Sequence, residues 1–298
     1  MYVISLEGNV LLLDKPIGLS SNNALQKVKR IYGVKKAGHA GNLDPLATGM
    51  LPICFGEATK FLQFLLNADK SYRVEFKLGE KTNTGDAEGE IIERHAVNVE
   101  YQQLSSVVNT FLGQIKQIPP MYSALKYQGQ ALYKLARQGI EVPREPRCVQ
   151  IYSIQLLGFE HNHALMEVSC SKGTYIRTLV EDIGDVLKCG AYVTALRRRE
   201  VGNYKESQMV AFEKLIASED NKEVLRSLLL PVESLLTAYP AVQLTSTTHF
   251  YIQRGQAVLI PHAPTQGYVK LISSDRNFIG IGVILSDGRV APKRLIKH

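Results

Sequence analysis

The texture of the sequence changes near Tyr239-Pro240, and this change constrains the fold more than any other feature. Before it, segments with the two-residue alternation of strands lie irregularly among segments with helical spacing. After it, short β-rich runs are separated by turns such as Ser286-Asp287-Gly288, which is a hairpin signal. A chain of 298 residues accommodates about two domains. We therefore predict one domain over residues 1–238 and a second over 239–298.

The first domain is predicted to be mixed α+β, with a mainly antiparallel sheet and flanking helices. Strands are expected at 8–13, 71–78, 148–159, 164–171 and 192–201, and helices at 24–31, 56–66, 100–113, 130–138, 174–187 and 223–230. Residues 79–90 are rich in Gly, Thr and Asp, so we expect a surface loop there. Because helices and strands do not alternate regularly, the order favours this fold over a doubly wound parallel sheet.

The second domain is predicted to be a small β-barrel, with strands at 268–272, 278–285 and 289–296. It is strongly basic, with two acidic residues (Asp275, Asp287) against seven basic ones (Arg254, Lys270, Arg276, Arg289, Lys293, Arg294, Lys297). Its balance of +5 makes up most of the net charge of +7 of the whole chain. This excess points to a polyanionic partner, although a basic surface can also serve solubility alone.

Composition excludes several classes of protein. Hydrophobic residues make up 45% of the chain, as in soluble globular proteins. The apolar run at 10–13 is too short for a membrane span or a signal-peptide core, so we expect a cytoplasmic protein. The cysteines are far apart and form no Cys-x-x-Cys pair, which predicts reduced thiols: Cys54, Cys148, Cys170 and Cys189.

Metal and cofactor motifs are not found in the sequence. His161-Asn162-His163 has no nearby Cys or carboxylate that would complete a metal site. There is no Walker loop, no dinucleotide-binding fingerprint and no Gly-x-Ser-x-Gly elbow. The sequence therefore favours chemistry without a cofactor or a metal.

Two segments carry candidate catalytic side chains. In the loop Gly38–Gly49, the residue Asp44 precedes a proline, which favours an extended backbone and a rigid turn. Taken alone, an Asp-Pro pair is usually only a turn former. Arg177 follows Gly173 in the first turns of a predicted helix, where a guanidinium could hold Asp44 ionised and oriented as a nucleophile. A solvated arginine on a helix face is the alternative.

Aromatic residues are interleaved with basic ones in three segments, of which Lys70-Ser71-Tyr72-Arg73 and Tyr175-Ile176-Arg177 are the most compact. RNA-binding proteins stack unpaired bases on aromatic rings while Lys and Arg contact phosphates. Tyrosines in half-buried strands also occur simply as core residues. The pattern is thus compatible with RNA binding without establishing it.

Taken together, ordered motifs over essentially the whole chain resemble the bacterial tRNA pseudouridine synthases of the TruB type. The matching segments are Leu12–Pro16, Ser20–Asn22, Ala37–Lys60, Lys70–Tyr72, Ile118–Lys126, Tyr133–Arg137, Gly173–Leu179 and Leu196–Arg198. The chain departs from the usual family pattern at Ala40, where Thr is common, and at Asn42. Neither change removes a charged group.

The resemblance implies isomerisation of a T-loop uridine of tRNA, at position 55, to pseudouridine. It implies that Asp44 is the catalytic carboxylate, Arg177 its ion-pair partner and Tyr72 the aromatic residue that stacks on the target base. His39, Tyr175 and Leu196 are expected to line the nucleotide pocket. The resemblance further implies a thumb-like insertion at about 119–147, a PUA-like C-terminal domain, the tRNA T arm as partner, no cofactor and a monomeric enzyme.

Two other functions are compatible with the sequence. A non-catalytic tRNA-binding or tRNA-folding protein could keep the same scaffold, although the presence of both Asp44 and Arg177 argues against it. An Asp-dependent hydrolase is disfavoured because the sequence shows no second carboxylate or metal set beside Asp44. The route of the reaction at Asp44, covalent or through elimination, is left open.

Overall fold

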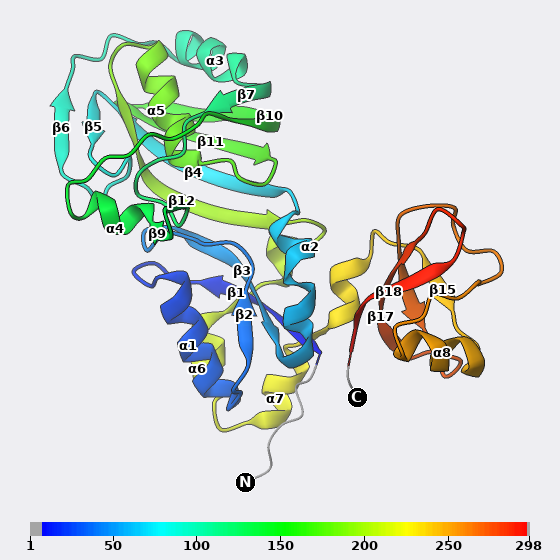
Figure 1. Cartoon of the computed structure of the whole chain (residues 1–298). Coiled ribbons are helices and arrows are strands. Elements are labelled where there is room, and N and C mark those ends of the chain that lie inside the picture. The colour runs from blue at the N-terminus through cyan, green and yellow to red at the C-terminus, as the bar shows by residue number, and fades with distance from the viewer. Residues whose placement is uncertain (1–7, 297–298) are drawn as a thin grey trace.

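The computed structural model describes residues 8–296, so Lys297 of the basic set lies outside the described residues. A ten-stranded sheet forms the framework of the larger lobe (Figure 1), in the order β13-β1-β3-β12-β4-β11-β10-β7, with β14 paired to β1 and β2 paired to β3. Its strands are β1 (Asn9–Lys15), β2 (Ala37–His39), β3 (Thr48–Phe55), β4 (Lys70–Leu78), β7 (Gly113–Gln117), β10 (Arg147–Glu160), β11 (His163–Cys170), β12 (Ala191–Val201), β13 (Val210–Ala211) and β14 (Leu230–Pro231).

The predicted mixed, mainly antiparallel sheet is confirmed. Only the β1–β13 and β3–β12 pairs are parallel among the pairs of this sheet described for residues 8–296. Two small antiparallel pairs lie outside it: β5 (Glu80–Thr82) with β6 (Ile91–Arg94), and β8 (Lys126–Tyr127) with β9 (Gln130–Ala131). The last pair lies within the predicted thumb-like segment.

Short helices and turns of 3-10 helix flank the sheet. They are α1 (Ser21–Tyr32), α2 (Leu62–Leu66), α3 (Tyr101–Thr110), α4 (Leu132–Ala136), α5 (Ile176–Val186), α6 (Phe212–Ala217) and α7 (Lys222–Ser227), with η1 (Gly56–Phe61), η2 (Glu206–Gln208) and η3 (Val232–Leu236). Side chains of α1, α3 and α5, such as Val28, Val108 and Ile183, belong to one buried cluster with Phe76 of β4. That cluster fixes the helices that border the candidate site.

Helix α1 shows how local sequence sets an element. The Ser20 hydroxyl accepts a hydrogen bond from the Asn23 backbone N–H at 3.1 Å, which satisfies one free donor of the first turn. Gly33 ends the helix in the left-handed conformation with φ of 64°, which a glycine adopts without steric cost. The helix that the sequence predicts at 24–31 is therefore confirmed, and it begins three residues earlier, at Ser21.

Strand β3 is missing from the sequence prediction, which expected no strand at 48–55. Its residues from Gly49 to Phe55 are all buried, because β3 pairs with β1, β2 and β12 and is covered on both faces. A strand covered on both faces has no alternation of polar and apolar residues. Pro52 within the run further obscures the strand signal.

The prediction of a surface loop at 79–90 is wrong for its middle part. Thr82 and Asp86 are 4% and 3% exposed. The Asp86 carboxylate accepts hydrogen bonds from the Thr84 hydroxyl at 2.6 Å and from the Glu88 backbone N–H at 3.1 Å. These polar side chains bond one another inside the protein, so polarity alone misrepresents their burial.

Two of the predicted helices are longer than the helices in the structure. The helix expected at 130–138 is α4 at 132–136, because β9 takes its first residues. The helix expected at 223–230 ends at Ser227, since Leu230-Pro231 pairs with β1 as β14. Both helices are short elements next to strand pairs, and helical spacing does not reveal such neighbours.

The smaller lobe is an open sheet and not the closed barrel that the sequence predicts. Its strands β15 (Ala241–Gln243), β16 (Tyr268–Ile272), β17 (Phe278–Ile284) and β18 (Val290–Leu295) form one four-stranded path, and within residues 8–296 the two end strands do not pair with each other. The three predicted strands are present. Helix α8 (Ser246–Gln253) was missed, because only Ile252 of it is buried and no apolar stripe marks it.

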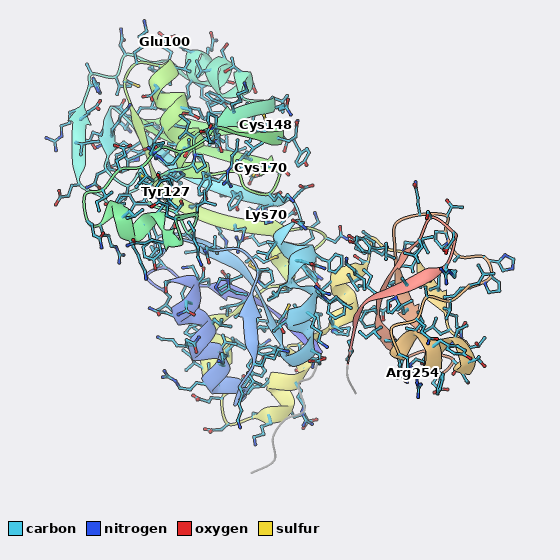
Figure 2. All side chains as sticks on the ribbon, in the orientation of Figure 1. Lys70, Glu100, Tyr127, Cys148, Cys170 and Arg254 are labelled. Carbon is cyan, nitrogen blue, oxygen red and sulfur yellow. The ribbon has the colours of Figure 1, made fainter. Side chains whose placement is uncertain are left out.

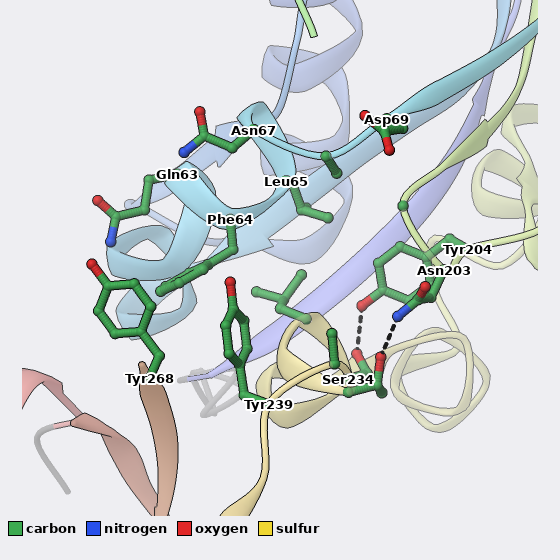
Figure 3. A pocket seen from close by; sticks show the side chains of 15 residues that line it. Gln63, Phe64, Leu65, Asn67, Asp69, Asn203, Tyr204, Ser234, Tyr239 and Tyr268 are labelled. Carbon is green, nitrogen blue, oxygen red and sulfur yellow. Dashed lines mark hydrogen bonds between the residues drawn. The ribbon is translucent and has the colours of Figure 1, made fainter. Parts of the chain in front are cut away.

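The two lobes meet at a cluster of aromatic side chains. Phe64 of α2 lies with its ring centroid 5.5 Å from that of Tyr239 and 5.9 Å from that of Tyr268, in edge-to-face geometry. A cavity of about 370 Å³ opens beside them (Figure 3). The ring centroids of Phe61 and Phe278 lie 5.8 Å apart, with the two rings tilted relative to each other. In the part of the chain from residue 8 to residue 296, no helix is long and apolar enough to cross a membrane.

Candidate active site

The loop that carries Asp44 is anchored by the start of α1. The Ser21 hydroxyl accepts a hydrogen bond from the Leu43 backbone N–H at 2.7 Å and donates one to the Leu43 carbonyl at 3.0 Å. The Gly18 backbone N–H donates to the Pro45 carbonyl at 2.8 Å. The motif at 20–22 thus has two roles, because one serine caps α1 and the next fixes the loop.

The buried side chain of Lys15 lies next to the same loop. The side chain is fully buried, and its ammonium donates to the carbonyls of Pro16 at 2.9 Å and Leu19 at 2.7 Å. Burial lowers the pKa of Lys15 to about 8, while the Asp44 charge opposes this shift. A buried cation next to the loop contributes positive potential at Asp44.

Asp44 and Arg177 meet, as the sequence predicts. Arg177 Nε lies 3.0 Å from Asp44 Oδ2. The Arg177 side chain is only 7% exposed, whereas that of Asp44 is 40% exposed. The guanidinium also donates to the carbonyls of Thr84 and Tyr122, each at 2.7 Å. Arg177 is therefore fixed on several sides, and the carboxylate that it holds remains open to a ligand. Figure 2 shows the side chains of the whole chain on the ribbon, with Lys70 at the start of β4 labelled.

The electrostatics of Asp44 result from opposing causes. Burial raises the pKa of its carboxyl, the Arg177 charge lowers it, the neighbouring Asp86 charge raises it and Lys15 lowers it. The net shift is upward. Asp44 thus titrates above the ordinary range of an aspartate, although an arginine holds its charged form.

Asp86 is a residue that the sequence analysis missed. Its carboxylate lies 3.7 Å from Arg177 Nε on the buried side of the guanidinium. The structure therefore does bring a second carboxylate near Asp44, contrary to the expectation from the sequence. Because Asp86 is buried and bonded to Thr84 and Glu88, it is placed to orient Arg177 rather than to contact a substrate. In the sequence, only the Thr-x-Thr-Gly-Asp pattern at 82–86 could have indicated a role for Asp86.

The remaining predicted site residues come from separate elements. Tyr72 lies half-buried on β4, and burial raises the pKa of its hydroxyl. Tyr175 directly precedes α5, and its backbone N–H donates to the Gln117 side chain at 3.1 Å. The Asp44 charge acts on the pKa of both hydroxyls, so both lie within its electrostatic range.

Leu196 and His39 complete the predicted set. Leu196 on β12 is 8% exposed and pairs with Val74 of β4. His39 ends β2, and burial together with the Arg198 charge lowers the pKa of its imidazole. The neutral ring therefore prevails near pH 7, and its Nδ1 is buried without a hydrogen-bond partner among the described residues. No hydrogen bond or ion pair joins His39 to Asp44 within residues 8–296.

Arg198 is a second residue that the sequence analysis did not assign to the site. Its side chain is 1% exposed. Its Nε donates to the Met50 carbonyl at 2.7 Å, and its two terminal nitrogens lie 3.4 Å and 3.3 Å from the carbonyls of Asn42 and Gly41. The site loop therefore rests on a buried guanidinium. The sequence Leu196-Arg197-Arg198 does not indicate which of the two arginines points inward.

Comparison with known proteins identifies the family. The model of the TruB family pseudouridylate synthase N-terminal domain matches residues 29–176, that of the tRNA pseudouridylate synthase B C-terminal domain matches 177–237, and that of the Pseudouridine synthase II TruB C-terminal region matches 240–296. The chain is 54% identical to the tRNA pseudouridine synthase B of Nitrosococcus oceani over 96% of its own length and 94% of that protein. The chain belongs to the TruB family of pseudouridylate synthases.

Other relatives of this TruB-family chain agree with the resemblance seen in the sequence, which is thereby confirmed. The tRNA pseudouridine synthases B of Coxiella burnetii and Vibrio cholerae are 55% and 53% identical, each over 97% of this chain and over 94% and 96% of their own lengths. The solved structure titled "Crystal Structure of a Cbf5-Nop10-Gar1 Complex" superposes with a TM-score of 0.76 at 25% identity, covering 98% of this chain and 86% of that one. The mixed α+β pseudouridine synthase fold is confirmed by the same comparison.

Among residues 8–296 of this TruB-family chain, no group of three or more His, Cys, Asp or Glu side chains is arranged to hold a metal ion. In the sequence, His161-Asn162-His163 was a weak candidate for a metal motif. In the structure, His161 and Asn162 form the turn between β10 and β11, with φ of 49° and 66°. The four cysteines are free thiols, three of them buried.

Proposed function

We propose that the protein isomerises the T-loop uridine at position 55 of tRNA to pseudouridine. The observation that carries the proposal is the 3.0 Å ion pair between a buried Arg177 and a partly exposed Asp44. Such a pair supplies an oriented carboxylate that a ligand can reach. The names of the bacterial relatives, tRNA pseudouridine synthase B, support the choice of tRNA as the substrate.

The reaction needs few chemical groups. The bond between C1′ and N1 breaks, the uracil rotates, and a bond between C1′ and C5 forms; C5 loses a proton and N1 gains one, so no atom is gained or lost overall. We assign Asp44 as the catalytic carboxylate and Arg177 as its ion-pair partner. Since the balance requires no electron acceptor or group donor, the chain's own side chains suffice.

Tyr72 is assigned to stack on the target base, with His39, Tyr175 and Leu196 lining the nucleotide pocket. A uridine inside a folded T loop has to be extruded to reach Asp44, which costs a few kcal/mol. Stacking on an aromatic ring contributes about 1–3 kcal/mol per base and so offsets this cost. The half-buried ring of Tyr72 within range of the Asp44 charge supports this assignment.

We further assign residues 1–238 to a catalytic domain and 239–298 to a PUA-like RNA-binding domain of a monomeric, cytoplasmic enzyme. Residues 119–147 are assigned as a thumb-like insertion that contacts the T arm. The Tyr122 carbonyl accepts a hydrogen bond from Arg177, so the base of this segment is joined to the site. The basic excess of residues 239–298 supports the RNA-binding role.

The main alternative is a tRNA-folding protein that uses the same scaffold without catalysis. The substitution Asp44→Asn separates the two. We expect it to abolish tritium release from tRNA labelled at C5 of uridine, while tRNA affinity stays within about 2-fold of wild type, because the basic surface is unchanged. Mapping pseudouridine in the product would identify the position. Release equal to wild type in Asp44→Asn would refute the catalytic assignment.

A further inference from the structure

The guanidinium of Arg198 is charged and buried. This burial needs an explanation, because it costs free energy of folding. A charged side chain removed from water destabilises the fold unless hydrogen bonds or an opposite charge compensate it. Within residues 8–296 no carboxylate lies in ion-pair distance of Arg198, and its partners are neutral carbonyls of β3 and of the site loop. Hydrogen bonds of this kind satisfy the donors without neutralising the charge.

The main chain brings Arg198 to the centre of the sheet, between two elements of the site. In the register of the sheet, Arg198 on β12 lies opposite Gly49 on β3 and opposite Tyr72 on β4. Gly49 has φ of 95°, and a Cβ at this position would lie 2.2 Å from the Arg198 carbonyl oxygen. Only a glycine allows this close approach of β3 and β12.

The side chain then connects the same two elements. On one side its terminal nitrogens reach the carbonyls of Gly41 and Asn42, three and two residues before Asp44. On the other side it lies opposite Tyr72 of β4; burial raises the pKa of the Tyr72 hydroxyl, and the Arg198 charge lowers it. A guanidinium only donates, so the hydroxyl oxygen of Tyr72 is the atom that can accept from it.

From this geometry we infer that Arg198 is a positioning residue, which fixes the distance and orientation between the loop of Asp44 and the ring of Tyr72. The inference rests on the proposed function, because it assumes that a nucleotide binds between these two residues. Among the described residues no hydrogen bond or ion pair joins Arg198 to Asp44, so Arg198 acts through the loop and the tyrosine. Its planar fork reaches several acceptors at once, which a lysine ammonium of different shape cannot reproduce.

The chain offers a matched control in the neighbouring residue. Arg197 points to the other face of β12, where it is 33% exposed and pairs with Asp14 at 2.8 Å and with Glu206 at 2.7 Å. Arg197→Lys and Arg198→Lys are therefore the same chemical change at adjacent positions of one strand. Partly exposed ion pairs contribute little to stability, so Arg197→Lys is expected to leave the melting temperature close to that of wild type.

The experiment measures single-turnover pseudouridine formation, tRNA affinity and thermal unfolding for wild type, Arg197→Lys, Arg198→Lys, Tyr72→Phe and Arg198→Lys/Tyr72→Phe. Misplacement of catalytic groups by about 1 Å costs about 100-fold in rate, and we expect a loss of this order in Arg198→Lys with tRNA affinity within about 2-fold of wild type. Arg197→Lys is expected to keep the wild-type rate.

The double variant separates positioning from a general structural role. If Arg198 acts through the Tyr72 hydroxyl, the two losses overlap, and the rate of the double variant exceeds the product of the single effects. Strictly multiplicative effects, or equal rates for Arg198→Lys and Arg197→Lys, would overturn the inference. If Arg198→Lys does not fold, Arg198→Gln, which keeps a planar donor group without the charge, is tested in the same cycle. A wild-type protein without any turnover would instead refute the proposed function.

Discussion

At the scale of single residues, the environment of Asp44 combines two opposite demands. A reactive carboxylate has to be ionised, and Arg177 at 3.0 Å favours this form. The same carboxylate is also partly shielded from water, and this burial raises its pKa. A nucleotide that covers the carboxylate would shield it further. Asp86 raises that pKa further, so the pair of carboxylates around one guanidinium adjusts the protonation of Asp44.

This arrangement predicts a pH dependence. The ionised form of Asp44 is taken as the active one, so the single-turnover rate is lost as the pH falls through the pKa of Asp44. Because that pKa is raised above its ordinary value, the loss begins at a higher pH than for a solvated aspartate. Removal of the Asp86 charge by Asp86→Asn makes deprotonation of Asp44 easier and is expected to move the midpoint toward acid. The measurement is a pH–rate profile under single-turnover conditions.

The control for this profile is Glu93→Gln, which removes an exposed carboxylate of β6. Its midpoint is expected to equal that of wild type, and circular dichroism at each pH confines the comparison to folded protein. A midpoint that Asp86→Asn moves toward alkaline pH would contradict the assigned electrostatics. The position of the midpoint is read independently of the maximum rate, which Asp86→Asn also lowers if Arg177 becomes less well oriented.

The sequence predicts part of this site. Local patterns made Asp44 and Arg177 candidates, as a carboxylate in a glycine-containing turn and an arginine behind a glycine, and the resemblance to the TruB-type enzymes implied that they pair. Asp86 and Arg198 could not, since both are defined by long-range contacts: Asp86 through Arg177, and Arg198 through Met50 on another strand. Local patterns do not show which charged residues a fold turns inward.

At the scale of elements, the segments with one buried and one exposed face were the predictable ones. Strands β4, β10, β11 and β12 have an alternating pattern or a long β-rich run and were predicted within a few residues. Strand β3 was missed because it is buried on both faces, and α8 because it buries almost nothing. Periodicity reveals an element only when one of its faces differs from the other.

Close packing of α5 on β12 gives a prediction at this scale. A Cβ on Gly184 of α5 would lie 2.3 Å from the Ala191 backbone nitrogen and 2.4 Å from the Gly190 carbonyl carbon, so backbone atoms would have to move. Overpacking of this kind costs about 1–3 kcal/mol. We expect Gly184→Ala to lower the melting temperature by several degrees in a thermal unfolding experiment followed by circular dichroism.

Gly158 provides the comparison. It lies in β10, and a Cβ at this position meets no atom within 4 Å. The free energy of unfolding of Gly158→Ala is expected to stay within about 0.5 kcal/mol of wild type. If both variants melt at the same temperature, the contact between α5 and β12 does not restrict residue 184, and the positioning of Arg177 by this helix loses its structural support.

At the scale of the whole molecule, the composition change at 239–240 lies directly before Ala241, where the first strand of the smaller sheet begins (Figure 1). The aromatic contacts of Phe61 and Phe64 with Phe278, Tyr239 and Tyr268 join the two lobes. The sequence predicts the basic character of the second lobe and its β content, but not the open sheet. Sheet closure depends on the pairing of distant strands, which turn signals and strand runs do not encode.

The charge of the second lobe gives a prediction for the complete chain. Lys293 and Arg294 of β18 are exposed. If this lobe contacts tRNA phosphates, each charge that binds a phosphate contributes about 0.7–0.9 to the slope of log affinity against log salt concentration. We expect Lys293→Gln/Arg294→Gln to reduce the magnitude of this slope by about 1.5.

The matched control is Lys214→Gln/Arg226→Gln, which removes the same two charge types from exposed positions on α6 and α7. Titration of fluorescent tRNA at several salt concentrations measures both slopes, and equal slopes for the two double variants would show that β18 does not contact the RNA backbone.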